Sequence, residues 1–415
     1  MNRLLIHNIG LLATPTGSAA KAGPAQGQIL LQNNAWILAE DGLIKQTGTG
    51  DSWQQIPQED LSLIDAGGKL VTPGLVDAHT HLLFGGWRQN ELGLKLHGAT
   101  YLDILAGGGG ILSTVRATRE ATEESLYQKA KEALDEMLTL GITSMEAKSG
   151  YGLDRETELK QLRVIRRLGE EHCMDVRSTF LGAHALPEDY KDDREAYIRF
   201  LCEEMIPEVA REGLADYCDV FCEKGVFTAE ESRVILEAGK QHGLTPKIHA
   251  DEIEAIGGSE LTAEVKAISA EHLIVCQPSG IEALAAGGTI ACLLPATSFY
   301  LGATYAPARD MIEAGVPVAA ATDFNPGSCP SLNLQLVMNL ACLRYKMTPE
   351  ETLTAVTLNA AAAIGRAGVL GSLEQGKQAD LVIWEAPDLD YLCYRMGSNL
   401  ASLVLKKGKI VKREK

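Results

Sequence analysis

The sequence predicts an α/β protein: a TIM-like (β/α)8 barrel joined to a small β-sandwich-like domain that both ends of the chain build. Three observations support this fold class. Eight apolar runs alternate with helical patterns through the middle of the chain, which is typical of βα units and a parallel sheet. The two ends are rich in short strands. Several of the middle runs end in polar residues, as the strands of barrel enzymes do.

The small domain is predicted in residues 1–65 and 368–415, and the catalytic barrel in residues 66–367. Short strands are expected near the start at 4–6, 29–31, 36–39 and 43–46, and near the end at 379–384, 403–405 and 410–411. Asp41-Gly42 separates two short apolar runs, which is a strong hairpin signal. Two strand-rich ends around one alternating middle indicate a single domain assembled from both termini.

The eight middle runs have the length of buried strands. They cover residues 75–79, 142–147, 176–183, 217–222, 247–250, 267–272, 289–294 and 316–322. Asp154 is expected to cap one of the intervening helices, and Thr348-Pro349-Glu350-Glu351 is a capping box with proline in the first turn. A doubly wound open sheet would show similar alternation, but the count of eight favours the closed barrel.

Four glycines at 107–110 could be mistaken for a phosphate-binding loop. No Gly-Lys-Ser or Gly-Lys-Thr follows them, so we expect a mobile loop near the barrel mouth instead.

The composition of the 415-residue chain limits its roles. Apolar residues make up 46% and charged residues 22%, and no apolar run approaches the ~20 residues of a membrane span. The first apolar run is too short for a secretory signal, and the nine cysteines contain no Cys-x-x-Cys pair, so we expect a cytoplasmic protein with free thiols. A formal charge of −17 opposes nucleic-acid binding, and an anionic substrate would need local positive groups.

His79 and His81 lie two residues apart at the end of an apolar run. Alternate residues of a strand point to the same side, so this pair aims both imidazoles at one point, which is the geometry of metal ligands. Two partly buried histidines bonded to backbone carbonyls are the alternative. Asp77 lies two residues before His79 and therefore points to the same side of the strand, so its carboxylate is expected to orient one of the histidines.

His249 and Asp323 end two further runs, where barrel enzymes place catalytic groups. An aspartate after five small or apolar residues needs a charged partner, and a metal ion supplies one. Three histidines and a carboxylate suit Zn²⁺ or Fe²⁺, with a water as the remaining ligand. We therefore predict one divalent transition metal, zinc or iron, bound by His79, His81, His249 and Asp323. A structural histidine and a structural ion pair are the alternatives for the last two.

The segment Val76-Asp77-Ala78-His79-Thr80-His81 resembles the first metal-binding strand of the amidohydrolase superfamily, whose members hydrolyse C–N bonds at the mouth of a (β/α)8 barrel. Over almost the whole chain, further motifs are together similar to those of the imidazolonepropionase family: Phe84-Gly85-Gly86-Trp87-Arg88, Lys148-Ser149-Gly150-Tyr151-Gly152, His249-Ala250-Asp251-Glu252 and Thr322-Asp323-Phe324-Asn325-Pro326-Gly327. The resemblance implies metal-dependent hydrolysis of the ring amide of 4-imidazolone-5-propanoate to N-formimidoyl-L-glutamate in histidine degradation.

The resemblance also implies roles for individual residues. Asp323 takes the proton of the metal-activated water and passes it to the departing ring nitrogen, His272 polarises the carbonyl or holds the water, and Glu252 meets the ring nitrogens. The other expected substrate-binding residues are Arg88, Tyr151, His184, Asn325, Gly327 and Ser328. Arginine suits the propionate because it pairs with a carboxylate through two parallel hydrogen bonds. Taken alone, Tyr151 and Ser328 are better explained by loop packing, and a core histidine is the alternative for His272.

Binuclear superfamily members bridge two metals with a lysine at the end of the fourth strand. Here that run ends at Glu223 and Lys224 comes after it, which favours one metal, and Lys148 is expected to support the loop that follows it. The nearest rival function is a purine or pyrimidine deaminase, and a rival of another class is an inactive barrel that serves as a scaffold. A homodimer is an expectation by analogy with superfamily relatives.

Overall fold

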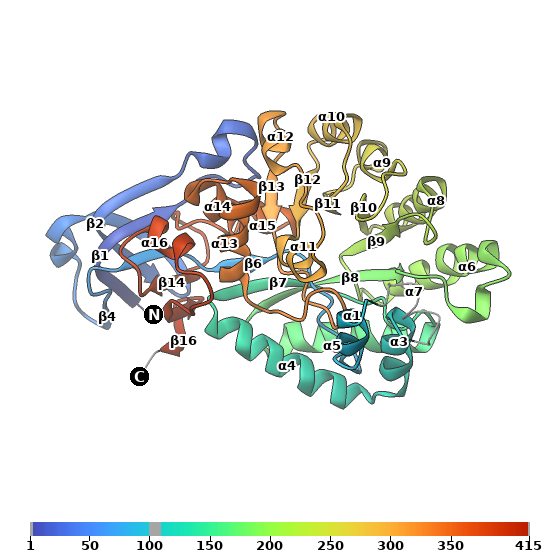
Figure 1. Ribbon diagram of the computed structural model, residues 1–415. Helices are drawn as coiled ribbons and strands as arrows, with labels where there is room; N and C mark the ends of the chain where they lie inside the picture. The colour runs from blue at the N-terminus through green and yellow to red at the C-terminus, as the bar shows by residue number, and fades with distance from the viewer. Residues whose placement is uncertain (1–2, 99–108, 414–415) are drawn as a thin grey trace.

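The computed structural model describes residues 3–98 and 109–413 and contains two separate sheets (Figure 1). One sheet is parallel throughout and has the strand order β13-β12-β11-β10-β9-β8-β7-β6. Its strands are β6 (Leu75–Asp77), β7 (Ile142–Lys148), β8 (Asp175–Ala183), β9 (Tyr217–Cys222), β10 (Thr245–Ala250), β11 (Ser269–His272), β12 (Ile290–Leu293) and β13 (Val318–Ala320). All eight strands fall on the eight predicted runs.

The parallel sheet closes into a barrel between its first and last strands. Just beyond β6 and β13, a parallel bridge joins Thr80 to Phe324. The N–H of Asp323 donates to the carbonyl of His79 at 3.0 Å, and the N–H of His81 donates to the carbonyl of Phe324 at 2.9 Å. These bonds form a seam between strands that are far apart in sequence. The predicted closed barrel is confirmed, and the doubly wound open sheet is excluded.

The second sheet is built from both ends of the chain and has the order β16-β15-β14-β5-β1-β2-β3, with β4 paired to β1. Its strands are β1 (Arg3–Thr14), β2 (Leu30–Glu40), β3 (Leu43–Thr49), β4 (Leu61–Asp65), β5 (Leu70–Pro73), β14 (Leu381–Trp384), β15 (Ala401–Lys406) and β16 (Lys409–Arg413). Only Gly74 separates β5 from β6, so the chain passes directly from this sheet into the barrel. The domain boundaries at 65 and 367 stay predictions.

The terminal strands are longer than the sequence suggested. The runs at 29–31 and 36–39 form one strand, β2, because the polar residues between them lie on its exposed stretch and keep the pairing with β1. Strand β1 continues past residue 6 because Asn8, at φ 55°, forms an irregularity from which pairing resumes at Ile9. The Asp41-Gly42 hairpin is confirmed: both residues have positive φ and connect the antiparallel strands β2 and β3.

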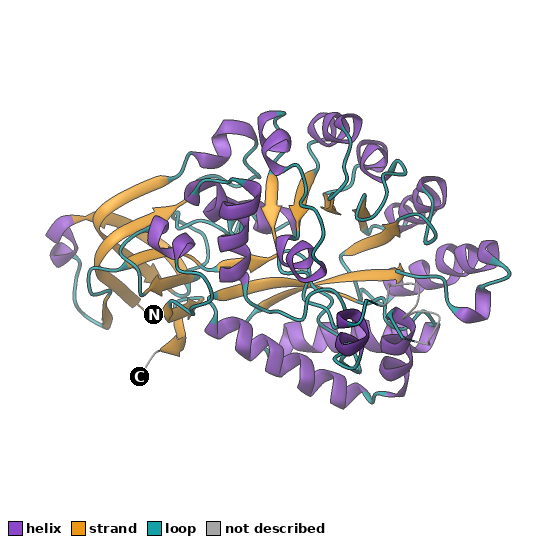
Figure 2. Ribbon diagram, viewed as in Figure 1, coloured by secondary structure: helices purple, strands orange, loops and turns teal. Residues whose placement is uncertain are grey.

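Helices surround the barrel (Figure 2). They are α1 (Glu91–Leu96), α3 (Ile111–Glu120), α4 (Glu123–Thr139), α5 (Arg155–Glu171), α6 (Arg194–Phe200), α7 (Ile206–Arg211), α8 (Ala229–Gln241), α9 (Gly258–Val265), α10 (Pro278–Gly287), α11 (Pro295–Leu301), α12 (Ala308–Glu313), α13 (Leu334–Tyr345), α14 (Pro349–Ala355), α15 (Leu358–Ala363) and α16 (Leu389–Tyr394). The predicted caps are confirmed: Asp154 accepts the N–H of Thr157 at the start of α5, and Thr348 forms a capping box with Glu351.

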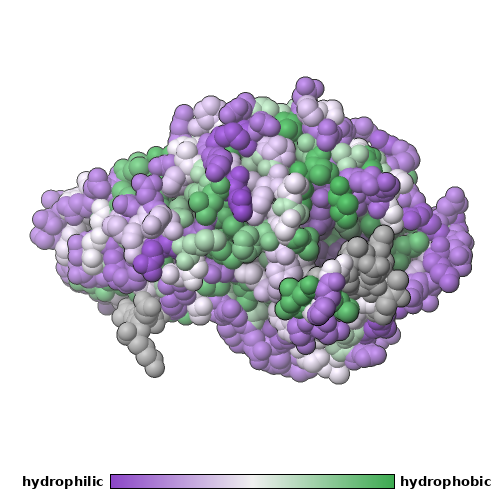
Figure 3. All heavy atoms as spheres, in the orientation of Figure 1, coloured by the Kyte–Doolittle hydropathy of each residue, from purple (hydrophilic) through white to green (hydrophobic). Residues whose placement is uncertain are grey.

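An apolar core fills the space between the strands and these helices. Helix α4 shows the pattern that produces it: the helix buries Leu126, Leu134 and Met137, while its outer side, along the lower edge of Figure 3, is hydrophilic. The predicted glycine loop at 107–110 lies partly outside the described residues. Gly110, which is described, donates its N–H to Glu91 at 2.7 Å.

Candidate active site

The four predicted metal ligands converge at the end of the barrel where the seam lies. His79 and His81 follow β6, Asp323 follows β13, and the backbone bonds across the seam hold these two segments in register. His249 lies within β10, and its Nε2 atom is 3.4 Å from Nε2 of His81. The strand-end pattern therefore brings together four side chains from three strands.

The separations among the donor atoms are short enough for all four to meet a single metal ion. His79 Nε2 lies 3.4 Å from Asp323 Oδ1, and His81 Nε2 lies 3.5 Å from the same oxygen. Metal–nitrogen bonds of about 2.1 Å at tetrahedral angles place two donors about 3.4 Å apart. Three nitrogens and one carboxylate oxygen suit a divalent transition metal, so these residues fit the predicted ion.

These side chains are buried, yet several of their polar atoms have no hydrogen-bond partner among the described residues. Both ring nitrogens of His79, Nδ1 of His81 and Oδ1 of Asp323 are in this state. Burial lowers the pKa of His79 and of His81 well below its usual range, so both imidazoles are neutral and can coordinate a metal. Because buried unpaired polar atoms are costly, the cluster favours a cation.

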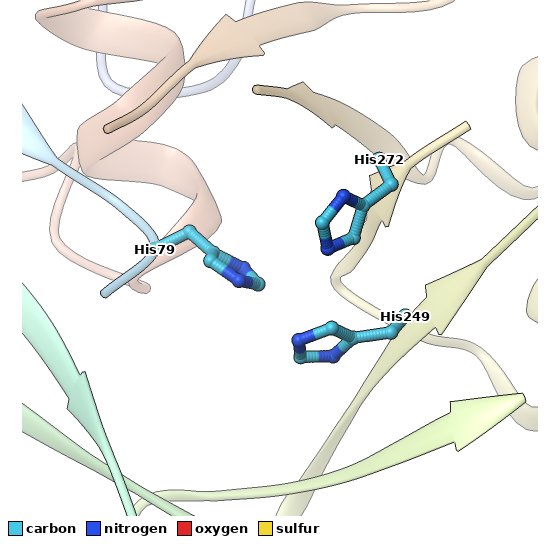
Figure 4. Close-up of side chains that lie close together, drawn as sticks. All are labelled: His79, His249 and His272. Atoms are coloured by element: carbon cyan, nitrogen blue, oxygen red, sulfur yellow. The ribbon is translucent and has the colours of Figure 1, made fainter. Parts of the chain in front are cut away.

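His272, at the end of β11, points toward the same centre as His79 and His249 (Figure 4). One ligand nitrogen from each of the three lies within 4.8 Å of the others. Nε2 of His272 is 3.6 Å from Glu252 Oε2. His272 (φ 70°) and Asp323 (φ 56°) both have left-handed backbones, a strained conformation that clusters at functional sites.

Two carboxyl groups at the site have raised pKa values. Burial raises the pKa of Asp323 to about 6, and Thr297 donates a 2.6 Å hydrogen bond to its Oδ2 atom. Burial and the neighbouring Asp323 raise the pKa of Glu252 to about 8. A carboxyl group that titrates near neutral pH can take up and release a proton during turnover.

The expected role of Asp77 is wrong. Its two oxygens accept hydrogen bonds from the N–H of Thr322 at 3.0 Å and from the Thr322 hydroxyl at 2.6 Å, rather than from a histidine ring. Because β6 ends at Asp77, the strand alternation that would align this carboxylate with His79 does not continue. Asp77 instead fixes the backbone next to Asp323.

Arg88 packs directly against Gly327 in the loop after Asp323. A Cβ atom on Gly327 would lie 0.9 Å from Nη2 of Arg88, so only glycine leaves space for this guanidinium. The Arg88 side chain is 13% exposed, and Glu91, 3.8 Å from its Nε, is too distant for a direct hydrogen bond. Nε itself is buried and has no hydrogen-bond partner among the described residues. Binding of an anionic group by Arg88 stays a prediction.

The remaining predicted substrate-binding residues lie close by. Asn325 holds its own loop: its Oδ1 accepts the N–H groups of Gly327 at 2.8 Å and Ser328 at 2.7 Å, and its Nδ2 donates to the Ser328 hydroxyl at 2.9 Å. The ring of His184 stacks on His81 at 4.9 Å, and the ring of Tyr151 lies 5.3 Å from that of His184. Contact of these residues with a substrate stays a prediction.

The sequence analysis missed a group of buried charged residues inside the barrel. Lys148 does not support the following loop, as we expected; its Nζ lies 2.8 Å from Glu146 Oε1 and 2.8 Å from Asp219 Oδ2. Lys247 lies 3.2 Å from the same Glu146 oxygen. The signal was present in the sequence, since a charged residue within an apolar strand needs a buried partner. Lys224 pairs at the surface with Glu254, away from the ligands.

Comparison with known proteins places the chain among hydrolases of this architecture. Residues 70–411 match the model of the amidohydrolase family. Proteins named imidazolonepropionase are similar over nearly their whole length: that of Alkaliphilus metalliredigens is 52% identical over 98% of this chain and 97% of its own, and that of Geobacillus kaustophilus is 51% identical over 99% and 98%. This chain belongs to the imidazolonepropionase branch of the amidohydrolase family. It is therefore an enzyme, a hydrolase with a divalent metal site.

Solved structures show how widely the fold of this family is shared. E. coli guanine deaminase aligns with a TM-score of 0.76 at 14% identity and covers 100% of both chains. A zinc-bound adenosine deaminase from Xanthomonas campestris aligns with a TM-score of 0.72 at 19% identity, over 98% of this chain and 92% of its own. These likenesses extend to the fold alone. Among the described residues of this amidohydrolase, no helix is long and apolar enough to cross a membrane.

Proposed function

We propose that this chain hydrolyses the ring amide of 4-imidazolone-5-propanoate to N-formimidoyl-L-glutamate. The observation that carries the proposal is Arg88, whose guanidinium lies on Gly327 beside the loop of the metal ligand Asp323. A group that binds a carboxylate thus stands next to a hydrolytic centre, in a chain whose formal charge is −17. A deaminase of uncharged purine or pyrimidine rings would not need it.

We assign one Zn²⁺ or Fe²⁺ to His79, His81, His249 and Asp323, because their donor atoms have the spacing and composition for it. A divalent ion at such a site lowers the pKa of a bound water to roughly 7 and so supplies a nucleophile at neutral pH. The protein keeps the two histidines of the first strand neutral through burial. Thr297 fixes the orientation of the Asp323 carboxylate through Oδ2.

In this proposal the water oxygen bonds to the ring carbonyl carbon, and the bond from that carbon to the ring nitrogen breaks. Asp323 takes the proton from the water and delivers it to the departing nitrogen, because its carboxylate lies among the histidine ligands, with Oδ1 3.4 Å from His79 Nε2. His272, which points toward the same centre, polarises the carbonyl oxygen. Glu252, partnered by His272, accepts hydrogen bonds from the ring N–H groups.

The substrate is bound at its tail by Arg88, with Tyr151 and His184 along one side and Asn325, Gly327 and Ser328 near the ring and the new carboxylate. We place the enzyme in the cytoplasm, a proposal supported by its nine free cysteines. A homodimer stays a prediction.

A turnover assay tests the function. Freshly prepared 4-imidazolone-5-propanoate is incubated with the metal-loaded enzyme, and N-formimidoyl-glutamate is measured. In parallel, guanine, adenosine and cytosine are tested for ammonia release, and the protein is analysed for zinc and iron. The proposal expects product only from the propionate substrate and only with the metal bound. Ammonia release without formimidoyl-glutamate would establish the deaminase alternative, and the absence of any turnover by metal-loaded protein would favour the scaffold.

A further inference from the structure

One buried carboxylate, Asp219, contacts a metal ligand from inside the barrel. Asp219 lies in β9, and its Oδ2 atom is 3.0 Å from Nδ1 of His249. The same oxygen is 2.8 Å from the ammonium of Lys148. All three side chains are essentially inaccessible to solvent. The opposite ring nitrogen of His249, Nε2, faces His81 and the metal centre.

The geometry points to Asp219 as a positioning residue for the metal: its carboxylate, 3.0 Å from Nδ1 of His249, keeps the imidazole proton on that nitrogen and so directs the Nε2 lone pair to the ion. A neutral imidazole carries one proton, and the hydrogen bond made by one nitrogen decides which nitrogen remains free to coordinate. A carboxylate behind a ligating histidine also fixes the ring orientation and raises its basicity. This inference rests on the proposed assignment of His249 as a metal ligand.

Lys148 explains how a carboxylate can be kept in this buried position. Its ammonium balances Asp219, and a second carboxylate, Glu146, balances Lys148 from the other side at 2.8 Å. Lys247 extends the chain of charges to Glu271 at 3.3 Å and donates to the carbonyl of Ala78, next to His79, at 3.3 Å. The network therefore touches the ligand-bearing segments on both sides of the centre.

The same residues do not form a second metal site. Ligand atoms of Asp219, His249 and Glu271 lie within 4.8 Å of one another, which would suit an ion. However, Lys148 already pairs with Asp219, and Lys247 already pairs with Glu271. Two protein ammonium groups therefore supply the positive charge at this position, in agreement with one metal per chain.

The test measures metal affinity rather than turnover. Asp219→Asn retains an oxygen that can accept from both Lys148 and His249 but loses the charge, whereas Asp219→Leu loses both. The dissociation constant for Zn²⁺ is measured by competition of the holoenzyme with a chelator, and the visible spectrum of the Co²⁺-loaded protein reports the geometry of the ligands. Loss of partners behind ligating histidines weakens metal binding about 10- to 100-fold. We expect the dissociation constant for Zn²⁺ to rise about tenfold in the asparagine variant and about 100-fold in the leucine variant.

Asp380→Asn is the matched control. Asp380 is also a buried carboxylate that shares a buried lysine, Lys406, with a second carboxylate, Asp175, but it directly precedes β14 of the terminal sheet. A purely structural role of Asp219 predicts that both asparagine variants lower the melting temperature and leave zinc affinity and the cobalt spectrum unchanged.

If Asp219→Leu does not fold, the zinc affinity of Asp219→Asn is the deciding measurement. The double variant Asp219→Asn/Lys148→Met also removes the ammonium group that would otherwise lose its carboxylate partner. Weaker zinc binding and an altered cobalt spectrum in these variants, but not in Asp380→Asn, support the inference. Zinc dissociation constants within twofold of wild type in every Asp219 variant overturn it, even if turnover falls. Lack of turnover with intact zinc binding in the wild type would instead count against the proposed function, so the two failures are distinguishable.

Discussion

Replacing Arg88 with methionine tests the proposed substrate most directly. The Arg88 side chain is 13% exposed, and its only ion-pair neighbour among the described residues, Glu91, is 3.8 Å from its Nε. Its buried Nε has no hydrogen-bond partner among the described residues. A carboxylate that pairs with the guanidinium gains two charge-assisted hydrogen bonds, each contributing about 1.5–3 kcal/mol, and the partial exposure reduces the sum. We expect a loss of roughly 2–4 kcal/mol of transition-state stabilisation, or about 30- to 900-fold in kcat/KM.

The assay compares kcat/KM on the propionate substrate with kcat/KM on an analogue whose tail carboxylate is amidated. Arg88→Met should reduce turnover of the acid strongly and of the amide only slightly, while zinc content stays at the wild-type level. Arg88→Lys should retain part of the activity, because a point charge keeps the attraction but loses the paired hydrogen bonds.

Arg233→Met is the charge-matched control, since Arg233 pairs with Glu264 on the outer surface at α8. It makes the same change in net charge and should leave both rates unaltered. The reasoning is refuted if the amide analogue loses as much as the acid does from Arg88→Met. In that case Arg88 is not the carboxylate anchor, and the substrate assignment weakens with it.

Three further predictions follow from the same site and from the fold. Elemental analysis should find one zinc or iron ion per wild-type chain and almost none in His249→Ala, whose circular dichroism should be unchanged; two ions per chain would contradict the ligand set. Gly327→Ala should mimic Arg88→Met, raising KM for the acid but not for the amide, because the new Cβ takes the place of Nη2. Burial raises the pKa of Asp175, but the ammonium of Lys406 outweighs it and holds that pKa below its usual range. Its stabilising effect should therefore be full above about pH 4 and be lost as the pH falls further, so urea unfolding of Asp175→Asn and wild type should differ by less at pH 3 than at pH 7.

Local signals in the sequence predicted the barrel because each of them acts over a few residues. The eight apolar runs, the Asp41-Gly42 turn and the caps at Asp154 and Thr348 depend on side chains near them in sequence, and all are found in the structure. The length of β1 was not predictable in this way. It depends on Asn8, whose left-handed backbone allows pairing with β2 to resume after an irregularity.

The site shows the same limit at the level of side chains. The strand-end rule brought His79, His81, His249 and Asp323 together, because the carboxyl ends of barrel strands meet at one mouth. The partners of the buried charges could not be derived from the sequence. Glu146 and Lys148 indicate only that each buried charge needs a partner, and not which residue supplies it. That Asp219 meets Lys148 follows from the curvature of the closed barrel, which places β7 and β9 within reach across its interior.

The position of the ligands on the seam connects the fold to the chemistry. A (β/α)8 barrel must join its first strand to its last, and here β6 and β13 are short, with three residues each. The closing bonds continue beyond the strands, through the backbones of His79, His81 and Asp323 themselves. Asp77, at the end of β6, adds two hydrogen bonds to Thr322 across the same line. Because the side chains of these residues are also the proposed ligands, an ion held there ties together the two strands whose closure makes the site. The strained left-handed backbone of Asp323 is thus held from both strands, which is the condition under which such strain persists in a folded protein.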